Sequence, residues 1–542
     1  MRTKQVVHAY NELNAKDSSR CLFLELRRYT LIPLATRREV LRTLLSVSAG
    51  SFLPAFEGGS NDPNTSVSAH ERPNFESVRS LIFQAIAHGK ATGVAVAVAH
   101  GGSIVWEEGF GWANREAGLK ATARTPFTLA SITKPFTATT LMTMAAEGKL
   151  LLDDPANKYL MKSGIQGTNG NADTATVRLL GAHVSGLPTM FEGYDRDEAK
   201  LALGPGELIR NYGRLAYSPG SCYEYSNIGF AALAVIASNL TGMDFGTLMT
   251  RRVLKPLGLR DSFFDSSVAR LSAGAARYDP SDNPIPYYTT STPASGELCA
   301  SAHDLAHFAM FNMKNHLPRR ASILDDRWID ELHKPVFVGP SGVATTFGWF
   351  TGHLESGAPV LFKNGGQPGV ATSLYMLPSE NLACMVLTNR SDGRELCSEV
   401  CNQVLASYNP EWRQPEETAG PSSTAFVVTP SFSGRWMGTL VNDGAKMPVR
   451  LNIESSDSAT LALGDKPAER ITGMQSEGVA FTGVSTGGID SADALRTGAK
   501  TLKIKLISHE GKLVGRILAT AGNPDVKNVM LPYVITLQRP SE

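Results

Sequence analysis

The chain has 542 residues, of which 42% are hydrophobic and 19% charged, and its formal net charge is +1. This length allows two or more domains with ample cores. The near-neutral charge argues against a nucleic-acid-binding protein, because no basic excess is present to neutralise phosphates. The 50 glycines and 30 prolines indicate many turns and argue against a helical bundle.

The N-terminal residues 1–58 have the composition of a targeting segment. Arg37 and Arg38 precede a short, moderately apolar stretch at residues 43–56, which is typical of a twin-arginine export signal. The stretch is shorter than a membrane-spanning helix requires. We therefore predict a periplasmic or secreted bacterial protein with no stable membrane span beyond this signal. The alternative is an amphipathic helix with two exposed arginines. Residues 59–74, rich in Gly, Ser, Asn and Pro, are predicted to be a linker.

The next segment has an α+β pattern. Apolar residues recur at helical intervals in residues 75–89. Residues 93–99 and 104–112 read as two strands, and Gly101-Gly102 between them favours a hairpin. An outer helix followed by a meander of strands indicates an α+β domain.

Ser131 and Lys134 begin a run rich in Ala, Thr and Met that is predicted to be a helix ending at Gly148. Both side chains would lie on one face of its first turn. A helix N-terminus favours a nearby oxyanion and lowers the pKa of an adjacent ammonium. A serine nucleophile with a lysine as proton acceptor requires this environment. The alternative is an N-capping serine followed by a solvated lysine.

Two further stretches offer partners for such a nucleophile. Tyr225 and Asn227 lie on a predicted loop before a helix, where a phenol near ammonium groups can act as a general base and the amide can orient substrate. Lys363, at the edge of a predicted strand, precedes Asn364 and Gly365, so the backbone can approach a ligand and the amine can bind a carboxylate or oxyanion. Taken singly, each is also explained by a structural turn or a solvated edge lysine.

Three other patterns receive a structural interpretation. His183 is followed closely by a Ser-Gly turn and is interpreted as a structural residue rather than a triad member. His303 and His307 are four residues apart without an evident third ligand, so no metal site is predicted. The Gly-x-Ser-x-Gly sequence around Ser485 lies in a Gly- and Ser-rich crossing and is predicted to be a loop, because a nucleophile elbow needs a buried strand before it and a helix after it.

The C-terminal part of the chain has a different pattern. Residues 75–408 are predicted to form the first domain, and residues 409–431 a linker. Short alternating segments separated by turn residues fill residues 432–542. They predict a small antiparallel β-barrel or sandwich.

The order of the three motifs resembles that of the serine β-lactamase and penicillin-binding protein superfamily, specifically its class C-like branch of family VIII esterases, D-aminopeptidases and DD-carboxypeptidases. The similarity covers residues 75–407. It implies an antiparallel sheet flanked by helices plus an all-helical lobe, and the C-terminal domain is similar to lipocalin-like modules attached to some members. Asn364 stands where β-lactamases have threonine, which leaves the substrate class open.

The resemblance implies acyl transfer without a metal or organic cofactor. Ser131 would be the nucleophile, and Lys134 and Tyr225 would share the acid and base work, with the first proton acceptor left open. The resemblance also implies an oxyanion hole made by two backbone N–H groups, those of Ser131 and Gly366. The side chains and backbone implied to orient the substrate are those of Asn227, Lys363, Asn364 and Gly365.

Two functions from different classes follow. The first is an exported serine hydrolase that forms an acyl-enzyme on Ser131 with a small-molecule ester, β-lactam or D-amino-acid peptide. The second is a non-catalytic protein of the same fold that binds peptidoglycan peptides. The chemically competent residues in all three motifs favour the enzyme.

Overall fold

The computed structural model describes residues 74–315, 322–416, 419–442 and 445–540. The predicted export signal at Arg37 and Arg38 and nearly all of the predicted linker 59–74 lie outside these residues.

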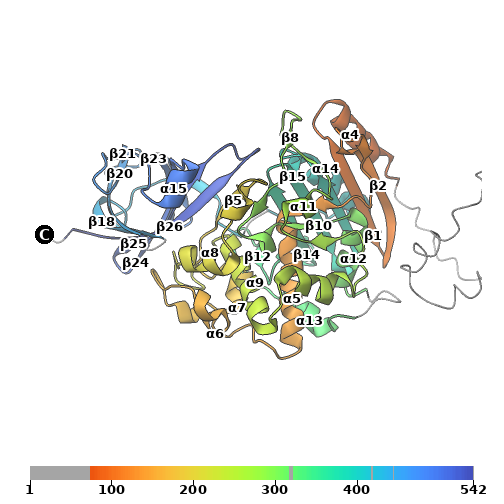
Figure 1. Ribbon diagram of the computed structural model, residues 1–542, viewed down its shortest axis with the longest axis horizontal. Coiled ribbons are helices and arrows are strands. Elements are labelled where there is room, and N and C mark those ends of the chain that lie inside the picture. Colours follow the sequence, from red (N-terminus) through yellow and green to blue (C-terminus); the bar gives the residue numbers. More distant parts are fainter. Residues whose placement is uncertain (1–73, 316–321, 417–418, 443–444, 541–542) are drawn as a thin grey trace, which may run out of the picture. The chain divides into compact units, whose positions relative to one another are not determined.

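A sheet of nine antiparallel strands organises the first domain (Figure 1), and its strand order is β11-β12-β13-β14-β15-β16-β1-β2-β3. Strand β1, which lies between β16 and β2, reads GVAVAVAH and is buried on both faces up to its exposed last residue, as a strand covered by helices on both sides must be. The strands are β1 Gly93–His100, β2 Ser103–Asn114, β3 Leu119–Lys120, β11 Phe337–Val338, β12 Ala344–Thr345, β13 Phe350–His353, β14 Pro359–Gln367, β15 Val370–Leu377 and β16 Leu382–Thr388. The α+β character predicted from residues 75–112 is confirmed.

Helices from both ends of this domain pack on the sheet. The first helix, α4 (Glu76–Ala87), contacts the last, α14 (Arg394–Tyr408), and α14 covers β15 and β16. Helix α12 (Ala302–Asn312) contacts β1, β2 and β16. The buried apolar side chains divide into two main clusters, one containing α4 and α14 and the other α5, α9 and α12, which places the sheet between them.

The helical lobe is built around α9 (Asn227–Thr241), which contacts α5, α6, α7, α8 and α10. Ser226 caps α9 by accepting a hydrogen bond from Gly229 N, and Gly242, with φ +68°, ends it. Because α9 is apolar on all sides, it is stable only when surrounded. The other helices are α5 Thr133–Ala146, α6 Asn157–Leu160, α7 Val177–Gly181, α8 Pro205–Tyr212, α10 Phe245–Met249, α11 Val268–Leu271 and α13 Asp326–His333.

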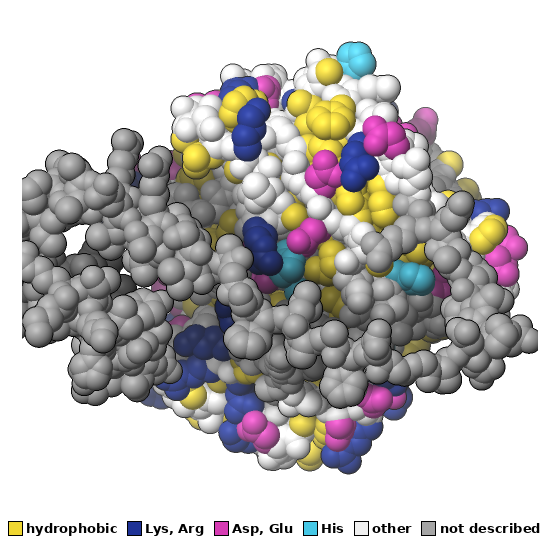
Figure 2. All heavy atoms as spheres, turned by 90° about the vertical axis from the view of Figure 1, so that its right-hand side faces the viewer, with side chains coloured by type: hydrophobic (Ala, Val, Ile, Leu, Met, Phe, Trp, Pro, Cys, Tyr) yellow, Lys and Arg dark blue, Asp and Glu magenta, His cyan; other side chains and the backbone are white. Residues whose placement is uncertain are grey.

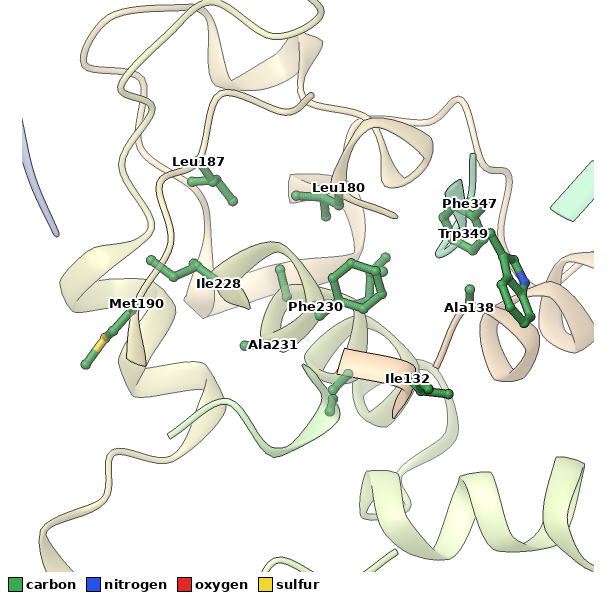
Figure 3. Close-up of a cluster of buried hydrophobic side chains, with 14 of the residues drawn as sticks. Ile132, Ala138, Leu180, Leu187, Met190, Ile228, Phe230, Ala231, Phe347 and Trp349 are labelled. Carbon is green, nitrogen blue, oxygen red and sulfur yellow. The ribbon is translucent and has the colours of Figure 1, made fainter. Parts of the chain in front are cut away.

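The core of the lobe lies directly against the Ser131 turn. Figure 3 shows Ile132 in one buried cluster with Ile228, Phe230 and Ala231 of α9. The remaining short strands of this part of the chain are β4 Phe127–Thr128, β5 Phe191–Tyr194, β6 Phe263–Phe264, β7 Arg277–Tyr278, β8 Pro284–Ile285, β9 Thr289–Thr290 and β10 Leu298–Ala300.

The C-terminal domain is one curled antiparallel sheet of order β17-β22-β23-β24-β25-β26-β18-β19-β20-β21. The predicted antiparallel strands are present, but no pairing joins β17 to β21 within the described residues, so the sheet is not a closed barrel there. Its elements are β17 Ser423–Ala425, β18 Gly434–Asn442, β19 Ala445–Ile453, β20 Ala459–Leu463, β21 Glu469–Arg470, β22 Thr472–Glu477, β23 Ala480–Thr486, α15 Ala492–Thr497, β24 Thr501–His509, β25 Lys512–Ala521 and β26 Val529–Gln538.

The segment predicted as a linker, 409–431, packs against its neighbours in its described part. The indole of Trp412 is buried and lies edge-on to Tyr375, and β17 pairs with β22. These contacts could not be predicted from the polar and proline-rich composition, because an isolated apolar residue such as Trp412 produces no periodic pattern in a sequence.

The C-terminal sheet also contacts the first domain. Strand β26 pairs with β5 through Val529 and Met530. Arg516 Nε lies 2.6 Å from a carboxylate oxygen of Glu224, which is 4% exposed and adjoins Tyr225. The C-terminal domain therefore supports the loop that carries the second motif.

The surface matches the near-neutral composition. On the face drawn in Figure 2, basic and acidic side chains are interspersed with hydrophobic ones. Within the described residues, no single helix has both the length and the hydropathy of a membrane span. The pair Asn227–Thr241 and Phe245–Leu254, bent by 80°, meets these criteria by length and composition only.

Candidate active site

Ser131 occupies a short 3-10 turn, Ala130–Ile132, that leads directly into α5. Ala130 has φ +46°, a left-handed conformation that is unfavourable for a residue with a side chain. Neighbouring strands hold the turn in place, since Leu129 N donates to Leu298 O (2.8 Å) and Leu129 O accepts from Thr372 Oγ1 (2.9 Å). The strained turn aims the half-buried Ser131 side chain from a rigid support.

Lys134 lies beside the serine and is completely buried. Its Nζ is 3.2 Å from Ser131 Oγ and donates to Ser295 O at 2.9 Å. Burial, with the nearby Lys363 charge, holds the pKa of Lys134 well below its usual value. A neutral amine at hydrogen-bond distance from the hydroxyl is suited to accept its proton.

Tyr225 contacts Ser131 from the other side, with 2.7 Å between the two hydroxyl oxygens. The amines of Lys134 and Lys363 lie 4.8 and 5.2 Å from the centre of its ring. Burial raises the pKa of the Tyr225 phenol above its usual value, against smaller opposing effects of the Ser131 hydrogen bond and the Arg394 charge. The phenol is therefore protonated at neutral pH, and the electrostatics favour Lys134 over Tyr225 as the first proton acceptor.

Asn227 and Lys363 each have a buried polar atom without a protein hydrogen-bond partner in the described part of the chain. Asn227 Nδ2 donates to Met190 O at 3.0 Å, whereas its Oδ1 is unpaired. Lys363 Nζ is unpaired, and its side chain is 1% exposed. Burial lowers the pKa of Lys363 to about 7. Because unpaired buried polar groups are costly, such atoms are typical of ligand sites.

The strand after Lys363 approaches the serine turn closely. A Cβ atom on Gly365 would lie 2.3 Å from both Leu129 O and Thr372 Oγ1. Strand β13 pairs with β14 only as far as Phe362, which leaves the edge of β14 beyond it without a strand partner in the described chain. Gly366 is exposed on this stretch. The side chain of Asn364 points elsewhere, because its Nδ2 donates to Tyr375 OH at 2.9 Å.

Gly365→Ala should lower kcat/KM about 100-fold, because displacement of a reacting group by about 1 Å costs roughly that factor. The backbone oxygen of Leu129 cannot move away from the added Cβ atom unless the Ser131 turn moves with it. Gly164→Ala is the matched control, since its Cβ would lie 3.5 Å from the nearest atom, an ordinary contact. Steady-state kinetics and thermal unfolding of both variants test this. Equal kinetics in the two variants would contradict a tight fit at Gly365.

Two residues near the site were not assigned to it from the sequence. The ring of His183 stacks on Tyr225 at 4.3 Å between centroids, and its Nδ1 accepts from Ser226 N. It thus supports the tyrosine, in keeping with the structural interpretation. Arg394 begins α14, and its Nη2 would lie 2.9 Å from a Cβ on Gly366. No local pattern distinguishes this arginine from other exposed ones, because only folding brings it to the β14 edge.

The structure corrects the expectation that His303 and His307 lack a third ligand. Asp304 lies with them, and the potential ligand atoms are within 4.8 Å of one another. The groups already have protein partners, since His303 Nδ1 contacts Glu107 at 2.7 Å and Asp304 Oδ2 accepts from Asp261 N.

Ser485 lies in strand β23, not in the predicted loop, and donates to Arg470 O. No helix begins directly after it, so it has no nucleophile-elbow geometry.

Comparisons with known proteins agree with this fold. The family model Beta-lactamase matches residues 78–399. Protein flp of Staphylococcus aureus (strain COL) is 25% identical over 58% of this chain and 63% of its own length. Esterase EstB of Burkholderia gladioli is 31% identical over 34% of this chain and 50% of its own length.

A solved structure extends the similarity. The octameric penicillin-binding protein homologue from Pyrococcus abyssi, 21% identical, covers 84% of this chain and 100% of its own, with a TM-score of 0.54. The chain belongs to the β-lactamase family, a family of serine hydrolases.

Proposed function

We propose that this protein is an exported serine hydrolase that works through an acyl-enzyme on Ser131. The observation that carries the proposal is the position of Ser131 Oγ, 3.2 Å from Lys134 Nζ and 2.7 Å from Tyr225 OH. A hydroxyl between a neutral amine and a protonated phenol has a proton acceptor on one side and a proton donor on the other.

In the proposed reaction, Lys134 Nζ takes the Ser131 proton while Oγ attacks the substrate carbonyl carbon. The backbone N–H groups of Ser131 and Gly366 stabilise the oxyanion. Tyr225 gives its proton to the leaving group as the tetrahedral intermediate collapses, and Lys134 returns a proton to the phenolate. Deacylation reverses these proton transfers. Tyr225 passes its proton to Lys134 and takes one from the attacking water, and Lys134 returns a proton to Ser131 Oγ as the acid is released. Each oxyanion donor contributes roughly 10²-fold or more to the rate.

The substrate side of the proposal rests on the unpaired polar atoms. Asn227 Oδ1 can accept a hydrogen bond from a substrate amide, and Lys363 Nζ can bind a carboxylate. The unpaired edge of β14 at Gly365 supplies backbone groups to align the substrate. These features suit esters, D-amino-acid peptides and β-lactams. We further propose that the C-terminal sheet is a lipocalin-like module and that Arg37 and Arg38 direct export.

The test is fluorophosphonate labelling followed by intact-mass spectrometry and peptide mapping. We expect one adduct, on Ser131. Parallel reactions with p-nitrophenyl butyrate, a D-alanyl-D-alanine peptide and benzylpenicillin then separate esterase, peptidase and β-lactamase activity by product release. An adduct on Ser485 would overturn the assignment of Ser131 as the nucleophile. No adduct and no product with any reagent would overturn the proposal and favour the non-catalytic peptidoglycan-peptide binder.

A further inference from the structure

The loop at residues 522–528, between β25 and β26, reaches from the C-terminal domain to the edge of the active site. Tight turns define its conformation: Gly522 has φ +81°, and Val526 N and Lys527 N both donate to Asn523 O. Ser391 Oγ donates to Asp525 O at 2.6 Å and accepts from Gly369 N at 2.7 Å. One serine thus ties this loop to the turn that follows Gly366.

A small apolar cavity lies beneath this loop. Its volume is about 190 Å³, which is below the size of sites for whole drug-like ligands and fits a single substituent. Residues of both domains form its walls, and the apolar ones are Phe191, Ile285, Pro286, Tyr288, Pro368 and Val526.

Two residues that line the cavity, Phe191 and Pro368, are neighbours in the sequence of residues at the candidate active site. Phe191 follows Met190, whose carbonyl accepts a hydrogen bond from Asn227. Pro368 stands two residues after Gly366, and its carbonyl accepts from Tyr288 OH at 2.9 Å. The cavity therefore lies between the segment that holds Asn227 and the strand proposed to bind the oxyanion.

We propose that this cavity, completed by Val526 of the C-terminal domain, binds an apolar aromatic or branched substituent of the substrate. The inference rests on the proposed function. Two charged residues also line the cavity, and both have partners: the Lys527 ammonium pairs with Glu198 at 2.5 Å, and the Asp195 carboxylate accepts hydrogen bonds from Asp197 N and Glu198 N. Burial of a neutral apolar group against Phe191 and Tyr288 favours binding through the hydrophobic effect. The C-terminal domain is thereby part of the specificity site.

The experiment compares the full chain with Val526→Trp, which fills the cavity, and Phe191→Ala, which enlarges it. Val479→Trp is the matched control, because Val479 is 81% exposed at another hairpin turn of the same domain and does not line the cavity. Two pairs of substrates are used. p-Nitrophenyl acetate and p-nitrophenyl phenylacetate differ in the acyl group, and methyl acetate and benzyl acetate differ in the alcohol. The readout is the ratio of kcat/KM for the bulky and the small substrate in each pair.

We expect the wild type to prefer the bulky substrate in one series, which identifies the substituent that enters the cavity. Val526→Trp should lower that ratio about tenfold or more, since a hydrophobic pocket discriminates by roughly 10–200-fold, whereas Val479→Trp should match the wild type. No preference in the wild type, or equal ratios for Val526→Trp and Val479→Trp, would overturn the inference. Fluorophosphonate labelling of Ser131 in the wild type reports the proposed function independently of these ratios.

Discussion

Ser131→Ala is expected to lower kcat by about 10⁵-fold or more and to abolish the fluorophosphonate adduct, because loss of a serine nucleophile removes the covalent route altogether. Any residual rate would come from the oxyanion donors and substrate binding. Lys134 and Tyr225 remain in place in this variant but have no hydroxyl between them. Kinetics with p-nitrophenyl butyrate and intact-mass spectrometry measure the two effects.

Ser485→Ala is the matched control for this variant. Ser485 has the Gly-x-Ser-x-Gly surroundings of a nucleophile elbow, but its hydroxyl is buried in β23 and bonded to Arg470 O. We expect it to retain wild-type kcat and labelling. Turnover by Ser131→Ala within about tenfold of the wild type would instead show that the hydrolysis does not proceed through Ser131.

Lys134→Met is expected to lower kcat/KM about 10³-fold at neutral pH, within the usual range for loss of a general base. In the wild type the active form is the neutral amine, so kcat/KM should rise with pH through the lowered pKa of Lys134. This acid limb should disappear in Lys134→Met. Tyr225→Phe should also be slow but should retain the limb, because Lys134 is still present. Lys158→Met, on the exposed surface, is the control for loss of a lysine charge.

Lys134→Met should also stabilise the protein at pH values between the lowered pKa of Lys134 and about 10.5. Between the lowered pKa of Lys134 in the folded state and about 10.5 in the unfolded state, only the unfolded chain carries the proton. The free energy of unfolding therefore rises with pH across this window in the wild type. Lys134→Met lacks this dependence, so its Tm advantage should shrink as pH approaches 10.5. An unchanged acid limb together with an unchanged Tm difference would show that Lys134 is charged in the folded protein.

Local sequence patterns predicted the elements whose structure depends on nearby residues. The helix at α4 and the hairpin of β1 and β2 follow from helical spacing, strand alternation and Gly101-Gly102. Strands β18, β19, β20 and β23 to β26 were likewise anticipated by alternation, whereas β21 and β22, which have no buried residue, were not. Alternation does not show whether the first and last strands of a sheet pair to close a barrel, so the absence of a pairing between β17 and β21 in the described residues could not be predicted.

The candidate site shows the same division. The sequence by itself determined which chemical groups are available: a serine and a lysine three residues apart, a tyrosine near an asparagine, and a lysine before two glycines. Only the tertiary structure decided that Ser131 and Tyr225, 94 positions apart, lie within 2.7 Å. It also brought Arg394 close to Gly366 and placed Val526 in the wall of the cavity lined by Phe191 and Pro368. The protonation of Lys134 depends on burial by distant residues, because the free energy of a charge is set by the groups that replace its water.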